Sequence, residues 1–237
     1  MKNTETEMPV TDHLNELRTR ITWIFLFVML TAAVAFAFNR QLISFLLMPF
    51  PDGVEIVQIG VTEGLGVSMK VALVAGLFVA FPIISFQTIM FVKPALKGNE
   101  KRYIYYSMPI VFILFLLGIS FSFFLLLPFM MKFLPTFLGD LVTPQISVKS
   151  VVGTTLWLMF VMGFIFQIPV VMFILAKIGI LDPQKVAKQR KFAILLSVIA
   201  GAIITPTGDP INMLIWAGPI WILFEIGLIL ARIASDK

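Results

Sequence analysis

Four stretches of this chain contain no charged residue over 18 to 26 consecutive positions, and they constrain the fold more than any other feature. As α-helices they would be about 27–39 Å long, enough to cross the roughly 30 Å hydrocarbon core of a membrane. Charged residues make up 13% of the chain, whereas soluble domains contain about 25%. We therefore exclude a soluble globular domain and a disordered chain, and predict an integral membrane protein. The stretches are residues 21–38, 71–92, 106–131 and 151–176.

The C-terminal part differs because a turn interrupts its apolar residues. Only 13 uncharged residues, 192–204, precede the sequence Thr-Pro-Thr-Gly-Asp-Pro at 205–210, and the apolar segment 211–231 follows. Proline and glycine disfavour a continuous helix there. We expect two short spans joined by a tight turn, with a re-entrant pair as the alternative. The prediction is an all-α integral membrane protein, a single domain over residues 1–237, with six transmembrane helices at about 21–38, 71–92, 106–131, 151–176, 192–204 and 211–231.

Lysine and arginine are distributed unequally between the two sides of this predicted bundle. The terminal segments and the second and fourth connections carry 14 of them, and the other connections carry four. Because basic residues are retained on the cytoplasmic side, both termini are expected in the cytoplasm. No cleavable signal peptide is expected, since the first run is long and lacks a small-residue cleavage site.

Several chemistries are excluded by what the chain lacks. Cysteine is absent and His13 is the single histidine, which removes disulfides, thiolate catalysis and Cys/His metal sites. No nucleophile motif is present. We expect no enzyme activity, no cofactor and no metal. The net charge of +5 follows the membrane topology, so nucleic acid is not an expected partner.

Polar residues near the first apolar run form the first candidate site. Hydrophobic residues recur at helical spacing from residue 10 to residue 21, and His13, Glu16 and Arg20 lie on the other face. Two interpretations are open. Glu16 and Arg20, four residues apart, can form an ion pair within the helix. Alternatively, Glu16 is a carboxylate presented at the membrane surface for a cationic ligand.

Glu100 is the one acid among four basic residues in the connection 93–102. It is either a solvated residue screened by its basic neighbours or a second carboxylate acting with Glu16. Carboxylates recognise arginine better than lysine, because the guanidinium group can bind both oxygens.

Two polar residues lie within predicted spans. Glu225 is an ionisable residue in the last span, which by default indicates a functional site, although a structural hydrogen-bond anchor is the alternative. Gln167 in the fourth span can bond another helix inside the membrane.

Short motifs recur along nearly the whole chain in a fixed order. They are HLNELRTR at 13–20, FVKPALKGNEKR at 91–102, GISFSFF at 118–124, LPF at 127–129, FQIP at 166–169, GIL at 179–181, ITP at 204–206 and LFEIG at 223–227. This order resembles the TatC family, the multispanning signal-peptide receptor of the twin-arginine protein translocase. The first two motifs are together specific for it.

The resemblance implies a concave, glove-like bundle of six helices that binds twin-arginine signal peptides on its cytoplasmic face. It implies partners as well: TatA/TatB-type single-span subunits, the signal peptides of folded cargo proteins, membrane lipid and further copies of the chain. Export would use the proton motive force, and the location would be the bacterial inner (plasma) membrane.

Site residues follow from the same resemblance. The signal-peptide site falls on Glu16, Glu100, Arg18, Phe91, Pro94, Lys101 and Arg102. Span five and the polar position Gln167 are where the single-span subunits would dock, and Glu225 matches the acid of the last span. Pro49 and Asp209 are expected to function in the outer loops. The sequence departs from the family where Gln167 replaces a frequent glutamate and where the turn before Asp209 contains an insertion.

A second function class remains open from the residues alone: a proton-coupled secondary transporter of small solutes with Glu225 as the coupling acid. Such a transporter should have ionisable residues in several spans, and here Glu225 is the clear intramembrane charge.

Overall fold

The computed structural model describes residues 10–50, 55–92, 100–133, 145–205 and 209–235. Within these ranges the chain is almost entirely helical. The elements are α1 (Val10–Ala37), α2 (Asn39–Leu47), β1 (Glu55–Val57), α3 (Glu63–Val92), α4 (Glu100–Phe121), the π-helix η2 (Ser122–Leu126), α5 (Leu127–Phe133), β2 (Gln145–Ser147), α6 (Val148–Ile165), α7 (Ile168–Lys177), α8 (Pro183–Lys188), α9 (Arg190–Ile204) and α10 (Pro210–Ser235).

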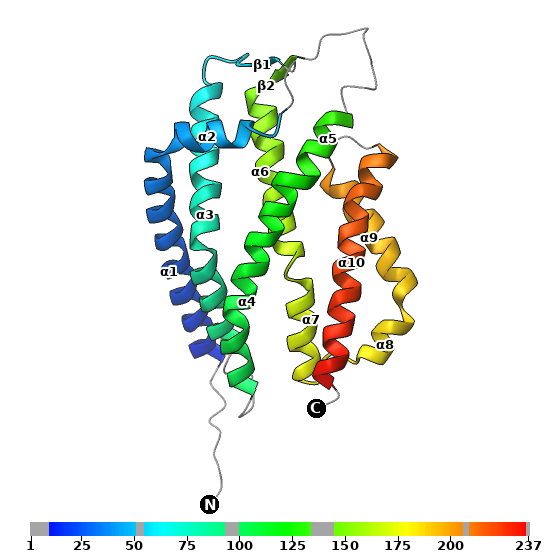
Figure 1. The fold of residues 1–237 in the computed structure, drawn as a ribbon. Helices are drawn as coiled ribbons and strands as arrows, with labels where there is room; N and C mark the ends of the chain where they lie inside the picture. Colours follow the sequence, from blue (N-terminus) through cyan, green and yellow to red (C-terminus); the bar gives the residue numbers. More distant parts are fainter. Residues whose placement is uncertain (1–9, 51–54, 93–99, 134–144, 206–208, 236–237) are drawn as a thin grey trace, which may run out of the picture.

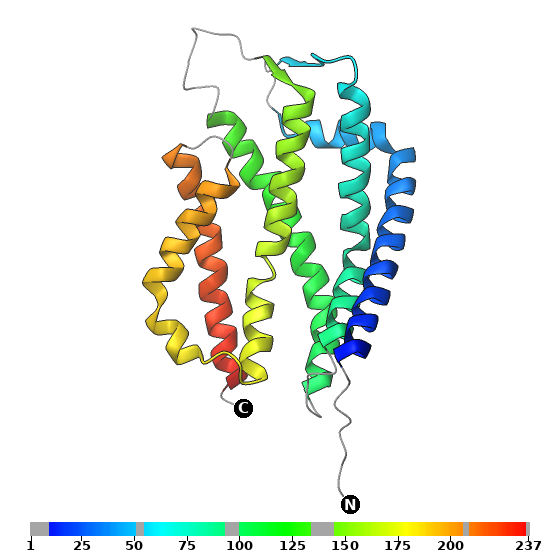
Figure 2. The ribbon, with the colours of Figure 1, turned by 180° about the vertical axis from the view of Figure 1, so that it is seen from behind.

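The long helices run side by side along one axis (Figures 1 and 2). The start of α1 and the end of α10 lie at the lower end of the bundle, and the two short strands lie at the upper end (Figure 1). Five helical segments of the described chain are long and apolar enough to cross a membrane: His13–Ala37, Glu63–Phe91, Ser107–Met131, Val148–Lys177 and Pro210–Ser235. α9 has 15 residues, or about 22 Å, which is less than the roughly 30 Å of a hydrocarbon core.

Prolines stand beside the interruptions in two of these segments. A proline lacks the backbone N–H that its helical turn requires. Pro169 stands at the start of α7, directly after the helix breaks at Phe166 and Gln167. Pro128 follows the π-helix Ser122–Leu126, which separates α4 from α5.

A short parallel sheet joins the upper ends of two helices, and the all-α prediction did not include it. β1 pairs with β2, with Glu55 opposite Gln145 and Val57 opposite Ser147. Gln145 also donates to the Glu55 carboxylate at 2.9 Å. The sheet ties the segment before α3 to the segment before α6.

α1 packs against α3 at unusually close range. A Cβ atom on Gly76 would lie 2.5 Å from the backbone nitrogen of Ala32, so only glycine permits this approach. Thr31 donates to the Gly76 carbonyl at 2.8 Å. The outer side of α1 remains exposed, with large apolar residues such as Trp23 and Phe25, as expected for a surface that faces lipid.

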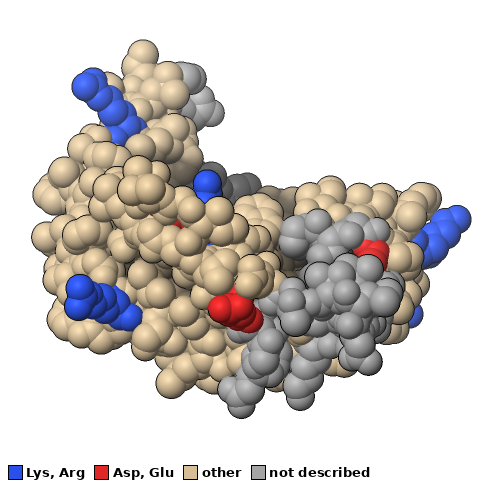
Figure 3. All heavy atoms as spheres, turned by 90° about the horizontal axis from the view of Figure 1, so that it is seen from above, with Lys and Arg blue, Asp and Glu red and all other residues tan. Residues whose placement is uncertain are grey.

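The core lies between α3, α6, α10 and the η2 segment. Its fully buried side chains include Trp216, Leu127, Leu158 and Met162. Seen from above, the molecule has a concave outline along one edge, and charged side chains are few among the described residues of that face (Figure 3).

Candidate functional site

Glu16 lies in a cluster of polar side chains at the lower end of α1. The Arg20 Nε atom donates to Glu16 Oε1 at 2.9 Å, and an Arg20 terminal nitrogen contacts the same oxygen. His13 Nδ1 is 3.8 Å from the second carboxylate oxygen. The structure therefore contains the ion pair that the spacing predicts. The Glu16 side chain is still 24% exposed.

Two residues of α3 complete this cluster. Arg20 donates to the Gln87 side-chain oxygen at 2.8 Å. The His13 ring stacks on Phe91 with centroids 4.3 Å apart. These contacts place Phe91, one of the predicted site residues, beside the helix turn that carries Glu16. A surface hollow of about 480 Å³ lies over the same place, and its lining is Asn15, Glu16, Thr19, Arg20, Trp23 and Gln87.

The other predicted residues of the signal-peptide site are described to different extents. Arg18 is exposed and lines a neighbouring hollow with Thr22 and Trp23. The first turn of α4 contains Glu100, Lys101 and Arg102 and lies at the same lower end of the bundle (Figures 1 and 2). Their side chains, like the whole of Pro94, lie outside the described residues. The joint action of Glu16 and Glu100 therefore stays a prediction.

Gln167 occupies the break between α6 and α7. Its side-chain nitrogen lies 3.2 Å from the Val111 carbonyl of α4 and 3.2 Å from the Gly163 carbonyl of α6. Both contacts are internal, so the amide stabilises the broken helix against α4. Gln167 Oε1 is buried and has no hydrogen-bond partner among the described residues.

Glu225 is paired with a base that the sequence did not connect to it. Arg190, the first residue of α9, donates to Glu225 Oε2 at 2.8 Å. The side chains of Glu225 and Arg190 are 23% and 49% exposed. The ion pair joins α9 to α10, which is the arrangement expected of a structural anchor.

The two predicted outer-loop residues lie at helix ends. Pro49 is half-buried in the turn after α2. Asp209 accepts hydrogen bonds from the backbone and side-chain nitrogens of Asn212, both at 2.8 Å, and so caps the start of α10. Asp182 caps α8 in the same way. The hydrogen bond from the Gln184 backbone lowers the pKa of Asp182 from its usual value.

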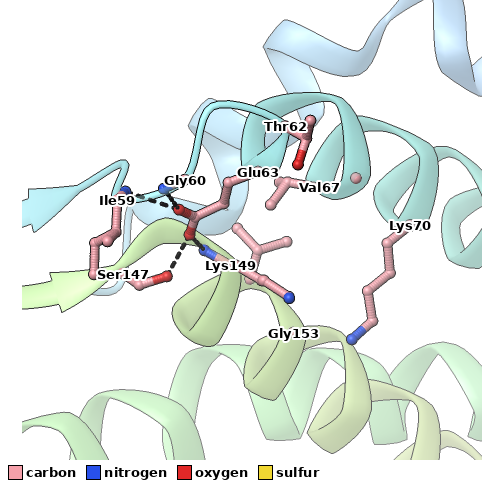
Figure 4. A pocket seen from close by; sticks show the side chains of 11 residues that line it. Ile59, Gly60, Thr62, Glu63, Val67, Lys70, Ser147, Lys149 and Gly153 are labelled. Carbon is pink, nitrogen blue, oxygen red and sulfur yellow. Dashed lines mark hydrogen bonds between the residues drawn. The ribbon is translucent and has the colours of Figure 1, made fainter.

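Glu63 is a structural centre that the sequence analysis missed. Its carboxylate accepts from the backbone nitrogens of Ile59 at 2.8 Å and Gly60 at 2.9 Å. It also accepts from the Ser147 hydroxyl and from the Lys149 backbone nitrogen (Figure 4). Glu63 thus holds the start of α3 to the start of α6. The available signal was its place three residues after Gly60, where a glutamate can bond back to the start of its own helix.

The comparisons with known proteins agree on one family. The model of the family described as "TatC: Sec-independent protein translocase protein (TatC)" matches residues 12–219. The Sec-independent protein translocase protein TatC of Carboxydothermus hydrogenoformans is 33% identical over 231 residues, which cover 97% of this chain and 95% of that protein. The TatC of Aquifex aeolicus is 34% identical over 236 residues, with 97% of each chain covered.

A solved structure is similar over nearly the whole chain. The crystal structure described as that of the twin arginine translocase receptor TatC superimposes with a TM-score of 0.83 at 33% sequence identity. The match covers 94% of this chain and 99% of that chain.

Proposed function

Because the chain belongs to the TatC family of Sec-independent protein translocase proteins, we propose that its lower surface binds twin-arginine signal peptides of folded cargo proteins. Members of this family are multi-pass membrane proteins of protein transport and not enzymes. Family membership favours this function over the proton-coupled transporter that the residues alone left open.

In the proposed topology the chain crosses a bacterial inner membrane six times, and both termini lie on its cytoplasmic side. The unequal distribution of basic residues supports this orientation. The start of α1 and the end of α10 at the same end of the bundle also support it, since an even number of crossings requires this (Figure 1). In this topology α9 is a short fifth span, and the concave outline supports the glove-like form that the family resemblance implies.

The observation that carries the proposal is the position of Glu16 in a surface hollow at the end of the bundle where basic residues are most numerous in the sequence. In the free protein, Arg20 occupies the Glu16 carboxylate. An arginine of the signal peptide would bind Glu16 in place of Arg20, while Arg20 keeps its bond to Gln87. The aromatic stack of His13 on Phe91 would hold α1 and α3 together while the peptide arginine replaces Arg20 at Glu16. Glu100, with Lys101, Arg102, Pro94 and Arg18 around it, would bind the second arginine.

Binding of a twin-arginine peptide to the purified full chain tests this proposal. We expect Glu16→Gln to weaken binding about tenfold or more, because a charge-assisted hydrogen bond contributes about 1.5–3 kcal/mol. Replacement of the two peptide arginines by lysine should cause a comparable loss.

The matched control is Glu55→Gln, which removes an acid from β1 at the opposite end of the bundle. The Glu55→Gln variant should bind the twin-arginine peptide with the affinity of the unaltered protein. If Glu16→Gln, once shown to be folded, binds the peptide as tightly as the control, Glu16 is not the recognition carboxylate.

We further propose that α9, the fifth span, and the position of Gln167 receive TatA/TatB-type single-span subunits, in an assembly with other copies of this chain that uses the proton motive force. α9 offers a row of exposed apolar side chains, including Phe192, Leu195, Leu196, Ile199 and Ile203. Gln167 contributes as an intramembrane polar residue that fixes the α6–α7 break, and Glu225 contributes by holding α9 through Arg190.

A further inference from the structure

We propose that the upper end of α3 and α6 contains a binding site for the phosphate group of an anionic phospholipid. The site is a cavity of about 490 Å³ between the two helices. Its lining includes Thr62, Glu63, Lys70 and Lys149 (Figure 4). It lies at the end of the bundle opposite Glu16, so it is separate from the proposed signal-peptide site (Figure 1).

Two ammonium groups point into this cavity from different helices (Figure 4). Lys70 Nζ of α3 lies 3.1 Å from the position that a Cβ atom on Gly153 would occupy. Lys149 precedes Gly153 by four residues in α6 and therefore stands on the same helix face. Glycine at position 153 leaves room for the Lys70 side chain above α6.

Neither lysine forms an ion pair with a residue that the structure describes. Glu63 lies in the same cavity, but its carboxylate oxygens already accept four hydrogen bonds from Ile59, Gly60, Ser147 and Lys149. Two positive charges thus enter one cavity, and the acid among its lining residues is already hydrogen-bonded. A bound anion would relieve their mutual repulsion.

The depth of the two lysines in the membrane indicates which class of anion would bind between them. Lys70 and Lys149 stand immediately before the uncharged stretches 71–92 and 151–176, where the hydrocarbon core gives way to the lipid headgroups. The floor of the cavity contains the buried apolar residues Val67 and Val152. Lysines above an apolar floor fit a phosphodiester attached to a glycerol backbone, and a free phosphate would leave that floor without a partner.

Native mass spectrometry of the purified full chain, titrated with phosphatidylglycerol or phosphatidylcholine, tests the site. We expect phosphatidylglycerol to bind more tightly than phosphatidylcholine. Lys70→Gln and Lys149→Gln should each weaken phosphatidylglycerol binding about fivefold, the effect of one basic residue near an anionic membrane surface. The doubly substituted Lys70→Arg, Lys149→Arg protein should bind as the unaltered chain does.

Arg40→Gln is the matched control, because it removes an exposed positive charge from α2 outside the cavity. Equal binding by the two lipids, or an effect of Arg40→Gln as large as that of the lysine variants, would overturn the proposal. Inorganic phosphate that displaces the lipid completely would overturn the choice of lipid as the anion. Both lysines are exposed, and the single Lys70→Gln variant decides the question if the double variant does not fold.

Discussion

At the residue scale, Arg20 would compete with the proposed ligand for the Glu16 carboxylate. It occupies the Glu16 carboxylate with a guanidinium group, the group that a signal peptide would supply. An ion pair near the protein surface contributes about 0–1 kcal/mol. We therefore expect Arg20→Gln to raise the affinity for a twin-arginine peptide about two- to fivefold, measured by fluorescence anisotropy in detergent.

The control is Arg232→Gln, which removes an exposed charge in the last turn of α10 at the same end of the bundle. It should leave affinity unchanged or slightly lower it. A fall in affinity for Arg20→Gln beyond that of the control would mean that Arg20 helps to hold the peptide, contrary to competition.

At the element scale, the α1–α3 pair depends on the absence of a side chain at Gly76. An alanine there would place its Cβ 2.5 Å from the Ala32 backbone, and overpacking of this kind costs about 1–3 kcal/mol. We expect Gly76→Ala to lower the thermal unfolding midpoint in detergent. Gly66→Ala, in the same helix, is the matched control, because its Cβ would meet nothing within 4 Å. Its midpoint should stay equal or rise, since alanine favours helix over glycine. Equal thermal unfolding midpoints for the two variants would show that α1 and α3 can move apart without loss of stability.

At the scale of the whole molecule, we predict that the short α9 makes export depend on local membrane thickness. Its 15 residues fall about 8 Å short of the hydrocarbon core, and each Å of mismatch costs a fraction of a kcal/mol. We expect four leucines inserted after Leu196 to preserve signal-peptide binding and to abolish export of a folded reporter protein. Normal export by this variant would exclude a role for the short helix in transport.

The insertion also moves Arg190 away from Glu225, so that effect needs a separate measurement. Arg190→Gln removes the ion pair without lengthening α9 and serves as the control. If Arg190→Gln alone abolishes export, the ion pair and not the helix length accounts for the loss.

The sequence by itself determined that this is a helical membrane protein and where its long apolar segments lie. A bilayer acts on each run of apolar residues separately, so length and charge suffice to identify a crossing segment. The motif order also identified the family, and the Glu16–Arg20 contact followed from helical spacing alone. The family and the five long helices are confirmed, while the roles of the site residues stay predictions.

Only the tertiary structure decided which distant residues meet. Arg190 joins Glu225 across 35 residues, and Arg20 reaches Gln87 across 67. Glu63 holds Ser147 across 84 residues, and Lys70 shares a cavity with Lys149. Helical spacing relates residues three or four positions apart, whereas these contacts depend on how the helices pack against one another. That packing includes close approaches such as Gly76 on Ala32 and the sheet formed by β1 and β2. No local pattern of apolar and charged residues encodes such contacts, because each requires two segments to be placed relative to one another in space.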